Sequence, residues 1–324
     1  MIIHTKRHSL RACALLLLAL SSIVRAQDYP SKPIRFINGF AAGGSSDTVV
    51  RIVAQKLSEA LGQPVPVETR TGAGGINGND FVAKSPADGY TLILITGAYP
   101  VQAALLKQLP YDPVRDFTFV SSLTFYPFVI AVNPASPHKN LESLIAFAKA
   151  NPGKLSFASA GVGTVHHLSG ELFNVLAGTD LLHIPFRGGV APMTELLAGR
   201  IDVMFETMTL TLPQVKAGRL HAVAVTSKDK SDFLPDVPAA AQTLPGYEVS
   251  SFLGVAVAAG TPAPIVERLN REIRRIVDMP EVKQRLAGLG GDARAGTPEE
   301  MRAHIERETD KWRRLIEARK IERQ

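Results

Sequence analysis

Residues 34–47, which read IRFINGFAAGGSSD, contain the signature of a strand, a glycine-rich turn and the first turn of a helix. Residues 34–37 are an apolar run of the strand type, the three glycines permit a tight backbone, and Ser-Ser-Asp is typical of a helix start. Such a turn presents free backbone N–H groups and the positive end of a helix dipole to one point. It therefore predicts an anion site, and the anion can be a phosphate, a reacting oxyanion or a carboxylate.

The same pattern returns in the middle of the chain, at residues 158–167, which read ASAGVGTVHH. A strand over 155–158 leads into this turn, and Thr164 is the expected N-cap of a helix that ends at Ala177. Around both turns, strands alternate with helices, which indicates parallel α/β units. We therefore expect each lobe to be a mostly parallel sheet flanked by helices, with one glycine turn per lobe.

The remaining periodicity predicts the other elements. Strands are expected over 64–68, 91–96, 117–120, 126–132, 183–186, 201–205, 220–226 and 247–258. Helices are expected over 48–61, 76–83, 141–150, 191–198, 212–217 and 262–277, and a last helix with an apolar stripe of Met301, Ile305, Trp312 and Ile316.

A chain of 324 residues is long for one core, so two domains are expected. Because no flexible linker separates them, we expect the extended runs near residues 126–132 and 247–257 to pass between two lobes as a hinge with a cleft. The predicted division is a signal peptide at 1–26, a discontinuous first lobe at 27–129 plus 250–324, and a second lobe at 130–249.

The first 26 residues are read as a secretory signal peptide. Basic residues precede an apolar run at 12–24 that is too short to span a bilayer, and Val24-Arg25-Ala26 resembles a cleavage site. Loss of its four basic residues reduces the formal net charge from +6 to +2, so the composition gives no reason to expect a nucleic-acid partner. Cys13, the only cysteine, lies at the start of the apolar run and most of the run follows it, which disfavours lipidation, and its removal leaves no thiol chemistry.

Catalytic motifs are weak in this chain. Ser159 lacks the glycine two residues earlier that a nucleophile elbow requires, and its nearness in sequence to His166 is not triad geometry. The glycine turn at 71–80 has Asn77 where a dinucleotide fingerprint needs its third glycine, and neither this turn nor the first has a Walker lysine. His166 and His167 are neighbours about 100° apart on a helix and are poorly placed to share a metal. No catalytic residue, cofactor or metal is therefore predicted.

Two glycine turns facing one cleft can bind carboxylates without a basic side chain. A charge-assisted hydrogen bond contributes about 1.5 to 3 kcal/mol, and four such bonds exceed the roughly 8 kcal/mol of a micromolar site before ordering costs. Asp47 is either a first-turn acid that complements the helix dipole or a residue of the cleft mouth. Arg187 is either a solvated loop residue or a ligand clamp.

The motifs together resemble one family, the extracytoplasmic solute receptors of tripartite tricarboxylate transporters, known as the Bug or TctC family. The resemblance covers residues 29–316. It rests on GFAAGGSSD, VETRTGAGGINGNDFVAKSPADGYTLILIT, YDPVRDFTFV, ASAGVGTVHHLSGELF, HIPFRGG, LLAGRIDVMFE, VKAGRLHAVAVTS, PDVPAA, LPGYE and GVAVAAGTPAP.

This resemblance implies a Venus flytrap of the type II-like periplasmic binding protein class, with two α/β lobes joined by two crossing strands. It also implies a ligand carboxylate held largely by backbone N–H groups and waters. The implied ligand-binding residues are Phe40, Ala41, Gly43, Gly44, Ser45, Ser46, Asp47, Thr96, Gly97 and Ala98 in the first lobe, and Ser159, Ala160, Gly161, Thr164, Arg187, Gly188 and Glu206 in the second.

Three stretches depart from the family pattern. Asn38-Gly39 precedes Phe40 where Pro-Phe or Pro-Tyr is usual, Phe205-Glu206-Thr207 replaces Phe-Asp-Asn, and Glu68-Thr69-Arg70 replaces Glu-Asn-Arg. The longer Glu206 changes the reach of the acid at the cleft wall.

The expected function is therefore a periplasmic, non-enzymatic and monomeric receptor. It captures a small mono-, di- or tricarboxylate and delivers it to the permease subunits of a membrane transporter. The alternatives are a carboxylate sensor for a signalling partner and a secreted α/β enzyme.

Overall fold

The computed structural model describes residues 29–40, 42–43, 45–186 and 191–323. The predicted signal peptide lies outside these residues, as do the site predictions at Ala41, Gly44, Arg187 and Gly188 and the side chain of Ser45. No helix within the described part of the chain is long and apolar enough to cross a membrane.

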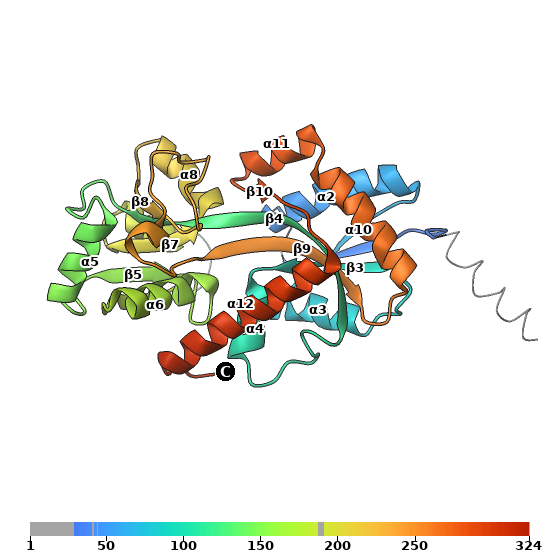
Figure 1. Ribbon diagram of the computed structural model, residues 1–324, viewed down its shortest axis with the longest axis horizontal. Helices are drawn as coiled ribbons and strands as arrows, with labels where there is room; N and C mark the ends of the chain where they lie inside the picture. The colour runs from blue at the N-terminus through green and yellow to red at the C-terminus, as the bar shows by residue number, and fades with distance from the viewer. Residues whose placement is uncertain (1–28, 41, 44, 187–190, 324) are drawn as a thin grey trace, which may run out of the picture.

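A single hydrogen-bonded sheet runs the length of the molecule in the order β2-β1-β3-β9-β4-β7-β5-β6, with β10 and β8 also paired to β4 (Figure 1). The strands are β1 Arg35–Asn38, β2 Val67–Thr69, β3 Thr91–Thr96, β4 Phe117–Val132, β5 Ser156–Ser159, β6 Leu182–Pro185, β7 Val203–Thr207, β8 His221–Val225, β9 Ser250–Ala258 and β10 Asp292–Ala293.

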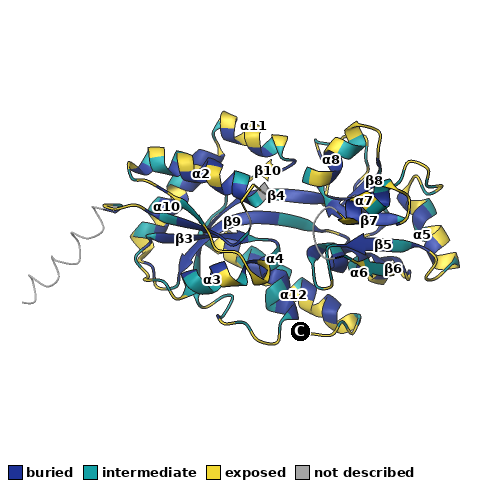
Figure 2. Cartoon of the chain, turned by 180° about the vertical axis from the view of Figure 1, so that it is seen from behind, coloured by how far each residue is buried: buried dark blue, intermediate teal, exposed yellow. Residues whose placement is uncertain are grey.

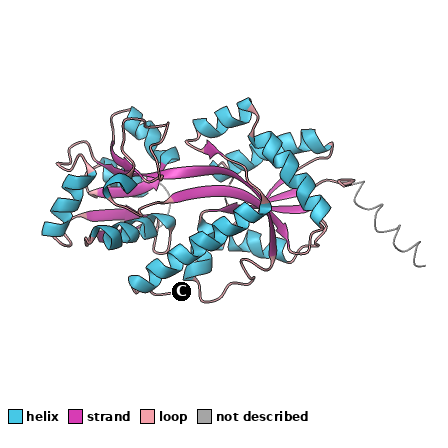
Figure 3. Ribbon diagram, viewed as in Figure 1, coloured by secondary structure: helices cyan, strands magenta, loops and turns pink. Residues whose placement is uncertain are grey.

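Helices cover both faces of this sheet (Figure 3). They are α2 Ser45–Leu61, the short 3₁₀ helix η1 Ala73–Gly75, α3 Ile76–Ala83, α4 Ala98–Leu105, α5 Leu141–Ala150, α6 Val165–Ala177, α7 Ala191–Leu197, α8 Met208–Lys216, α9 Ala240–Thr243, α10 Ala263–Val277, α11 Pro280–Gly288 and α12 Pro298–Ala318. The central strands are buried, the edge strands β2 and β6 are partly exposed, and the outer faces of the helices are exposed (Figure 2).

The two long strands β4 and β9 join two lobes. β4 pairs with β9 up to Pro127 and with β7 and β8 from Phe128 onward. The first lobe contains β1, β2, β3, β9 and β10, and the second contains β5, β6, β7 and β8. The change of pairing partner after Pro127 supports a division of β4 near this residue. The exact lobe boundaries at 129/130 and 249/250 are still predictions.

Both halves of the sheet are mixed. The expected parallel pairing is present where β1 joins β2 and β3, and where β5 joins β6 and β7. Every pairing made by β4 or β9 is antiparallel. The reason is geometric, since the strands that pass from one lobe to the other and back must run in opposite directions.

The strand β4 is continuous where two separate strands were expected. The intervening residues include Ser121, Ser122 and Thr124, which are buried. Their hydroxyl groups donate to the backbone carbonyls of Gly296, Arg294 and Asp292, at 3.0, 2.8 and 3.0 Å. Because these hydroxyls are satisfied by the neighbouring segment, polar residues can occupy the middle of a buried strand.

Three α-helices were not predicted, α4, α9 and α11. For α4, no element was predicted between the strand expected over 91–96 and the strand expected over 117–120. In the structure Pro100 lies in the first turn of α4, where a missing backbone N–H removes no helical hydrogen bond.

The last helix, α12, begins with a capping box formed by Thr297 and Glu300. The predicted apolar stripe is confirmed, and Trp312 is 1% exposed. The C-terminal end of the stripe packs into the main core cluster of the second lobe, together with Leu105 of α4 and Phe128 of β4. Met301 and Ile305 at the other end of the stripe pack in a core cluster of the first lobe, so the helix contacts both lobes. The buried apolar residues of α10 and α11 belong to a cluster of the first lobe.

Candidate ligand-binding site

A cavity of about 410 Å³ lies between the two lobes, on one face of the β4/β9 pair. Its floor is formed by Tyr126 and Phe128 of β4 and by Ser251 and Leu253 of β9. The side walls come from both lobes and consist of Phe40, Ser46, Gly74, Thr96, Gly97, Ala98, Val101, Gln102, Ala160, Gly163, Thr164, Val165, His166, Thr207 and Thr209.

Four helix N-termini contribute to this wall. Ser46 lies in the first turn of α2, Ala98 begins α4, Thr164 is the N-cap of α6, and Thr207 is the N-cap of α8. The first backbone N–H groups of a helix have no partner within the helix, and its N-terminus carries partial positive charge. Among the described residues, no aspartate or glutamate lines the cavity. The site therefore favours an anion.

The first glycine turn is organised by Asp47 rather than by its glycines alone. This carboxylate is buried and accepts hydrogen bonds from Gly43 N at 3.0 Å, Asn38 Nδ2 at 3.3 Å and Arg51 Nε at 2.8 Å. The hydrogen bond from Arg51 is the main cause that lowers the pKa of Asp47, against the effect of burial. The side-chain oxygen of Asn38 in turn accepts from Phe40 N at 3.2 Å. Asp47 thus fixes the turn from behind the cavity wall.

The second glycine turn is closed by hydroxyl groups. Thr164 donates to the carbonyl of Gly161 at 2.8 Å and accepts from His167 N at 3.3 Å, which confirms it as the N-cap of α6. Ser159 is buried, its hydroxyl oxygen lies 3.0 Å from the same carbonyl oxygen, and it accepts from Gly161 N at 3.1 Å. Its oxygen also lies 2.6 Å from His183 Nε2. The hydroxyl has one proton, which it donates either to the Gly161 carbonyl or to His183, depending on the tautomer of the imidazole.

Glu206 lies behind the wall in a buried pair with His166. Its Oε1 is 3.0 Å from His166 Nε2 and also accepts from the backbone N and the hydroxyl of Thr207, at 2.6 and 2.9 Å. Burial by itself lowers the pKa of His166, but the carboxylate of Glu206 raises it above its usual value overall. The same partner lowers the pKa of Glu206 in spite of its burial. The carboxylate of Glu206 is therefore ionised, and its charge is paired with His166 behind the cavity wall. It adds no negative charge to the wall itself.

Two further histidines lie behind the second turn. His167 and His183 stack with ring centroids 4.0 Å apart, and His167 Nδ1 accepts from Gly163 N at 3.2 Å. Chiefly by burial, the pKa of each is lowered to about 4. Both rings are neutral near pH 7 and support the turn through hydrogen bonds.

Acid should destabilise the fold through one buried and two half-buried histidines. Burial lowers the pKa of His167, His183 and His304 from 6.5 to about 4. The unfolded chain then binds up to three protons that the folded chain does not, so stability is full above pH 6.5 and falls as the pH drops toward 4. Urea unfolding across this window should show that decline, and His304→Gln should reduce its slope by about one proton. A slope that His304→Gln leaves unchanged would contradict the assignment for this residue.

The structure brings many of the predicted site residues to one cavity. Those that line it are Phe40, Ser46, Thr96, Gly97, Ala98, Ala160 and Thr164. Gly43, Asp47, Ser159, Gly161 and Glu206 are not part of the lining and act behind it through the contacts above. Their roles toward a ligand remain predictions.

Several residues that line the cavity were not predicted from the sequence. They are the floor residues Tyr126, Phe128, Ser251 and Leu253, together with Gly74, Val101, Gln102, Gly163, Val165, His166, Thr207 and Thr209. The floor residues sit at alternate positions of strands that were predicted to cross between the lobes, so period-2 alternation could have identified them once the cleft face was known.

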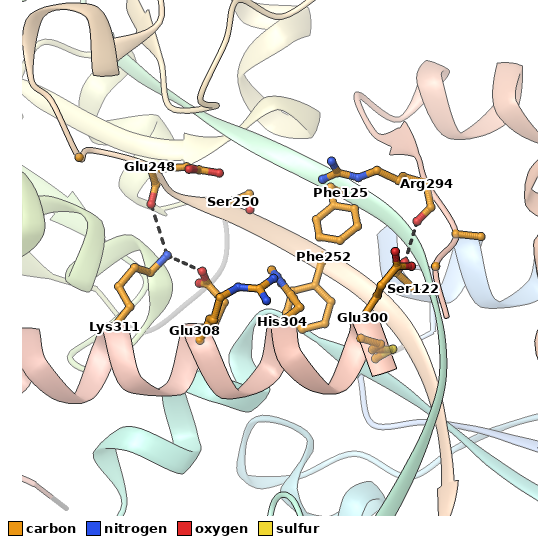
Figure 4. A pocket seen from close by; sticks show the side chains of 15 residues that line it. Ser122, Phe125, Glu248, Ser250, Phe252, Arg294, Glu300, His304, Glu308 and Lys311 are labelled. Atoms are coloured by element: carbon orange, nitrogen blue, oxygen red, sulfur yellow. Dashed lines mark hydrogen bonds and ion pairs between the residues drawn. The ribbon is translucent and has the colours of Figure 1, made fainter. Parts of the chain in front are cut away.

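A larger cavity, of about 640 Å³, lies on the opposite face of the β4/β9 pair, where the alternate residues Phe125, Ser250 and Phe252 form its floor (Figure 4). The side chain of His304 on α12 lies over Phe252, with ring centroids 4.6 Å apart. Arg294 stacks on Phe125, with its guanidinium carbon 4.1 Å from the ring centroid.

Charges of both signs line this second cavity. Lys311 donates to Glu308 Oε1 at 2.7 Å and to the backbone carbonyl of Glu248 at 3.3 Å (Figure 4). The carboxylates of Glu248, Glu300 and Glu308 all belong to its lining. Three basic residues, Arg294, Arg307 and Lys311, match these acids in number, so the lining has no excess of positive charge. The smaller cavity, which collects four helix N-termini and no acid among the described residues, is the better candidate site for an anion.

The fold and the cleft place this chain in the class of two-lobed periplasmic binding proteins. Residues 49–321 match the model of the tripartite tricarboxylate transporter family receptor. The chain belongs to this family, whose members are solute-binding receptors.

Known relatives agree with this membership. The chain is 35% identical to the protein BugT of Bordetella pertussis, over 92% of each chain. Two similar solved structures come from Rhodopseudomonas palustris. One, determined with adipate, has a TM-score of 0.78 at 30% identity and covers 90% of this chain and 98% of that one. The other, MatC with bound malate, has a TM-score of 0.75 at 31% identity and covers 89% and 100%.

Proposed function

We propose that this protein is a periplasmic receptor that binds a small organic carboxylate in the interlobe cavity and delivers it to the permease subunits of a tripartite tricarboxylate-type transporter. It acts as a monomer and performs no catalysis. The observation that carries the proposal is the convergence of four helix N-termini on one cavity whose described lining contains no acid.

The energetics of such a site are sufficient for capture. Hydrogen bonds from backbone N–H groups to a carboxylate contribute about 1.5 to 3 kcal/mol each, and helix dipoles add about 0.3 to 1 kcal/mol each. A few such contacts support a micromolar affinity after ordering costs. The adipate and malate bound by the two similar structures are carboxylates, which supports the same ligand class here.

The absence of catalysis is proposed from the state of the candidate groups. Ser159 is engaged by its own loop, and Glu206 is ion-paired with His166. Neither group is free to act as a nucleophile or as a base in the cavity.

Calorimetry and thermal denaturation with a panel of mono-, di- and tricarboxylates test the proposal. At least one acid should bind with 1:1 stoichiometry and stabilise the fold by about 2.7 kcal/mol at a concentration of 100 times Kd. The corresponding primary amide, which lacks the negative charge, is the control and should not bind. Chemical conversion of the bound acid would contradict a receptor role. Uptake into vesicles that contain the permease should require the receptor.

A further inference from the structure

Two helices from different lobes touch at one edge of the interlobe cavity. Thr209, in the first turn of α8 in the second lobe, lines the cavity. Its hydroxyl group donates a hydrogen bond of 2.6 Å to the backbone carbonyl of Leu289. Leu289 is the C-cap of α11, which packs in the first lobe. The hydrogen bond therefore ties the two lobes together beside the cavity.

The residue after Leu289 is a glycine, and the contact between the helices depends on it. Gly290 has a φ of 74°, in the left-handed region that favours glycine. A Cβ atom at this position would lie only 3.1 Å from Met208 Cγ and 3.1 Å from the backbone nitrogen of Thr209. Because a side chain here would push α8 away from the end of α11, Gly290 allows the two backbones to approach closely.

The end of α11 is firmly attached to the first lobe. Gly291 N donates to the carbonyl of Leu286 at 3.0 Å, which closes the turn after the helix. Gly291 also lies against β4, because a Cβ atom there would be 2.6 Å from Tyr126 Cε1. The first lobe therefore presents the carbonyl of Leu289 in a fixed position, which α8 reaches only when the lobes are together.

The opposite edge of the cavity is held by a core that both lobes share. In Figure 1 and Figure 2, α8 and α11 lie at the top of the molecule, whereas α4 and α12 lie at the bottom. Leu105 of α4 in the first lobe and Trp312 of α12 are buried in one cluster with Leu168 of α6 in the second lobe. Arg319, the C-cap of α12, also pairs with the buried Glu171 of α6 at 2.6 Å.

The two edges differ in what their separation would cost. At the α4/α12 edge, apolar side chains of both lobes would become exposed to water. At the other edge, the buried apolar residues of α8 and α11 belong to different core clusters. Parting these two helices breaks a hydrogen bond that water can replace at little net cost. Opening of the lobes is therefore easier at the α8/α11 edge.

We propose that the contact of Thr209 with Leu289 and Gly290 is a latch, which must break before a ligand leaves the cavity. The lobes open at this edge and turn about the shared core of α4, α6 and α12. Thr209 is a positioning residue, because its hydroxyl group acts on the contact between the lobes and not on the ligand. The inference rests on the proposed ligand-binding function and extends it to the release step.

Distances between spin labels test the latch without any ligand. Cys13 is the only cysteine and lies in the predicted signal peptide, so the mature chain accepts paired cysteine labels. One pair, at the exposed Leu210 of α8 and Gln284 of α11, spans the latch. A second pair, at the exposed Lys107 after α4 and Val175 of α6, spans the opposite edge.

Thr209→Val removes the hydroxyl group and nearly keeps the volume of the side chain. It should raise the ratio of long to short distances across the latch by about 2- to 12-fold, the effect of losing one hydrogen bond, and leave the opposite pair unchanged. Thr209→Ser, which keeps the hydroxyl group, should restore the wild-type ratio. A latch distance that Thr209→Val leaves unchanged, or an equal change at both edges, would overturn the inference.

Release rates test the consequence for a bound acid, with malate and adipate as the probes. In stopped-flow mixing followed by a fluorophore on Gln284→Cys, Gly290→Ala should raise the dissociation rate at least about two-fold and change the association rate less. Gly290 is not in the cavity lining, so this variant keeps the contacts to the ligand. Gly288→Ala is the matched control, because a Cβ atom there would have nothing within 4 Å, and it should keep the wild-type rate.

The two measurements separate the latch from the binding function. A dissociation rate that Gly290→Ala leaves unchanged would overturn the latch and leave carboxylate capture intact. If no acid of the carboxylate panel bound, the proposed function would fail, whereas the label distances would still decide whether the latch exists.

Discussion

Replacing Trp312 with alanine should lower the free energy of unfolding by about 3 to 5 kcal/mol, the usual cost of truncating a buried tryptophan. The ring is 1% exposed and belongs to the core cluster that holds Phe128 and Leu105. This cluster joins the C-terminal helix α12 and the helix α4 to the second lobe. Because most domains are stable by only about 5 to 15 kcal/mol, the loss should be plain in urea unfolding followed by circular dichroism.

The control is the truncation of an exposed aromatic residue, which removes a ring without removing core packing. Phe147 on α5 is 38% exposed, and Phe147→Ala should cost much less than Trp312→Ala. If Trp312→Ala cost less than about 1 kcal/mol, α12 would not be part of the second-lobe core.

Replacing Asp47 with alanine should weaken ligand binding at least about ten-fold. The change removes the acceptor shared by Gly43 N, Asn38 Nδ2 and Arg51 Nε. Asn38 is buried, and a buried donor left unpaired costs about 1 to 3 kcal/mol, whereas the exposed Gly43 and Arg51 lose the contact that ties them to the turn. The loop should relax away from its binding geometry, although Asp47 itself does not line the cavity. Calorimetry with the best acid of the carboxylate panel measures the effect.

The control for this variant is a surface aspartate. Asp310 on α12 is exposed and pairs with Arg313 at 2.6 Å, and exposed pairs contribute about 0 to 1 kcal/mol. Asp310→Ala should leave the affinity unchanged. Asp47→Asn should fall between the two, because the amide can still accept from Gly43 N. An Asp47→Ala protein that binds as tightly as the wild type would show that the turn holds its shape without the carboxylate.

Much of the fold was predictable because its signals are local. The helix start at Thr164 follows from an N-cap hydroxyl, and the last helix follows from its apolar stripe. The prediction failed at the middle of β4, where Ser121 and Thr124 are satisfied by carbonyls about 170 residues away. It also failed at α4, which lies in a stretch where no element was predicted.

The candidate site was predictable only in part. The sequence identified two glycine turns as anion sites, and these turns predict that the N-termini of α2 and α6 lie at the site. The N-termini of α4 and α8 also reach the cavity, but neither has a glycine-rich signature of its own. Gln102 and His166 line the cavity but were not predicted as site residues, because no local pattern shows which side chains of a helix will face the cleft.

The sequence by itself determined the strand–turn–helix units, the two-lobed architecture and the family, because each depends on residues close together in the chain. The tertiary structure decided which of these units share a cavity. Pairing of β4 with β9 puts Tyr126 opposite Ser251 on one face and Phe125 opposite Phe252 on the other, which separates the binding cleft from the charged cavity behind it. It also decided that the acids Asp47 and Glu206 lie behind the wall, where each is neutralised by a neighbour. Such pairings join residues distant in sequence, and only the folded register of the strands brings them together.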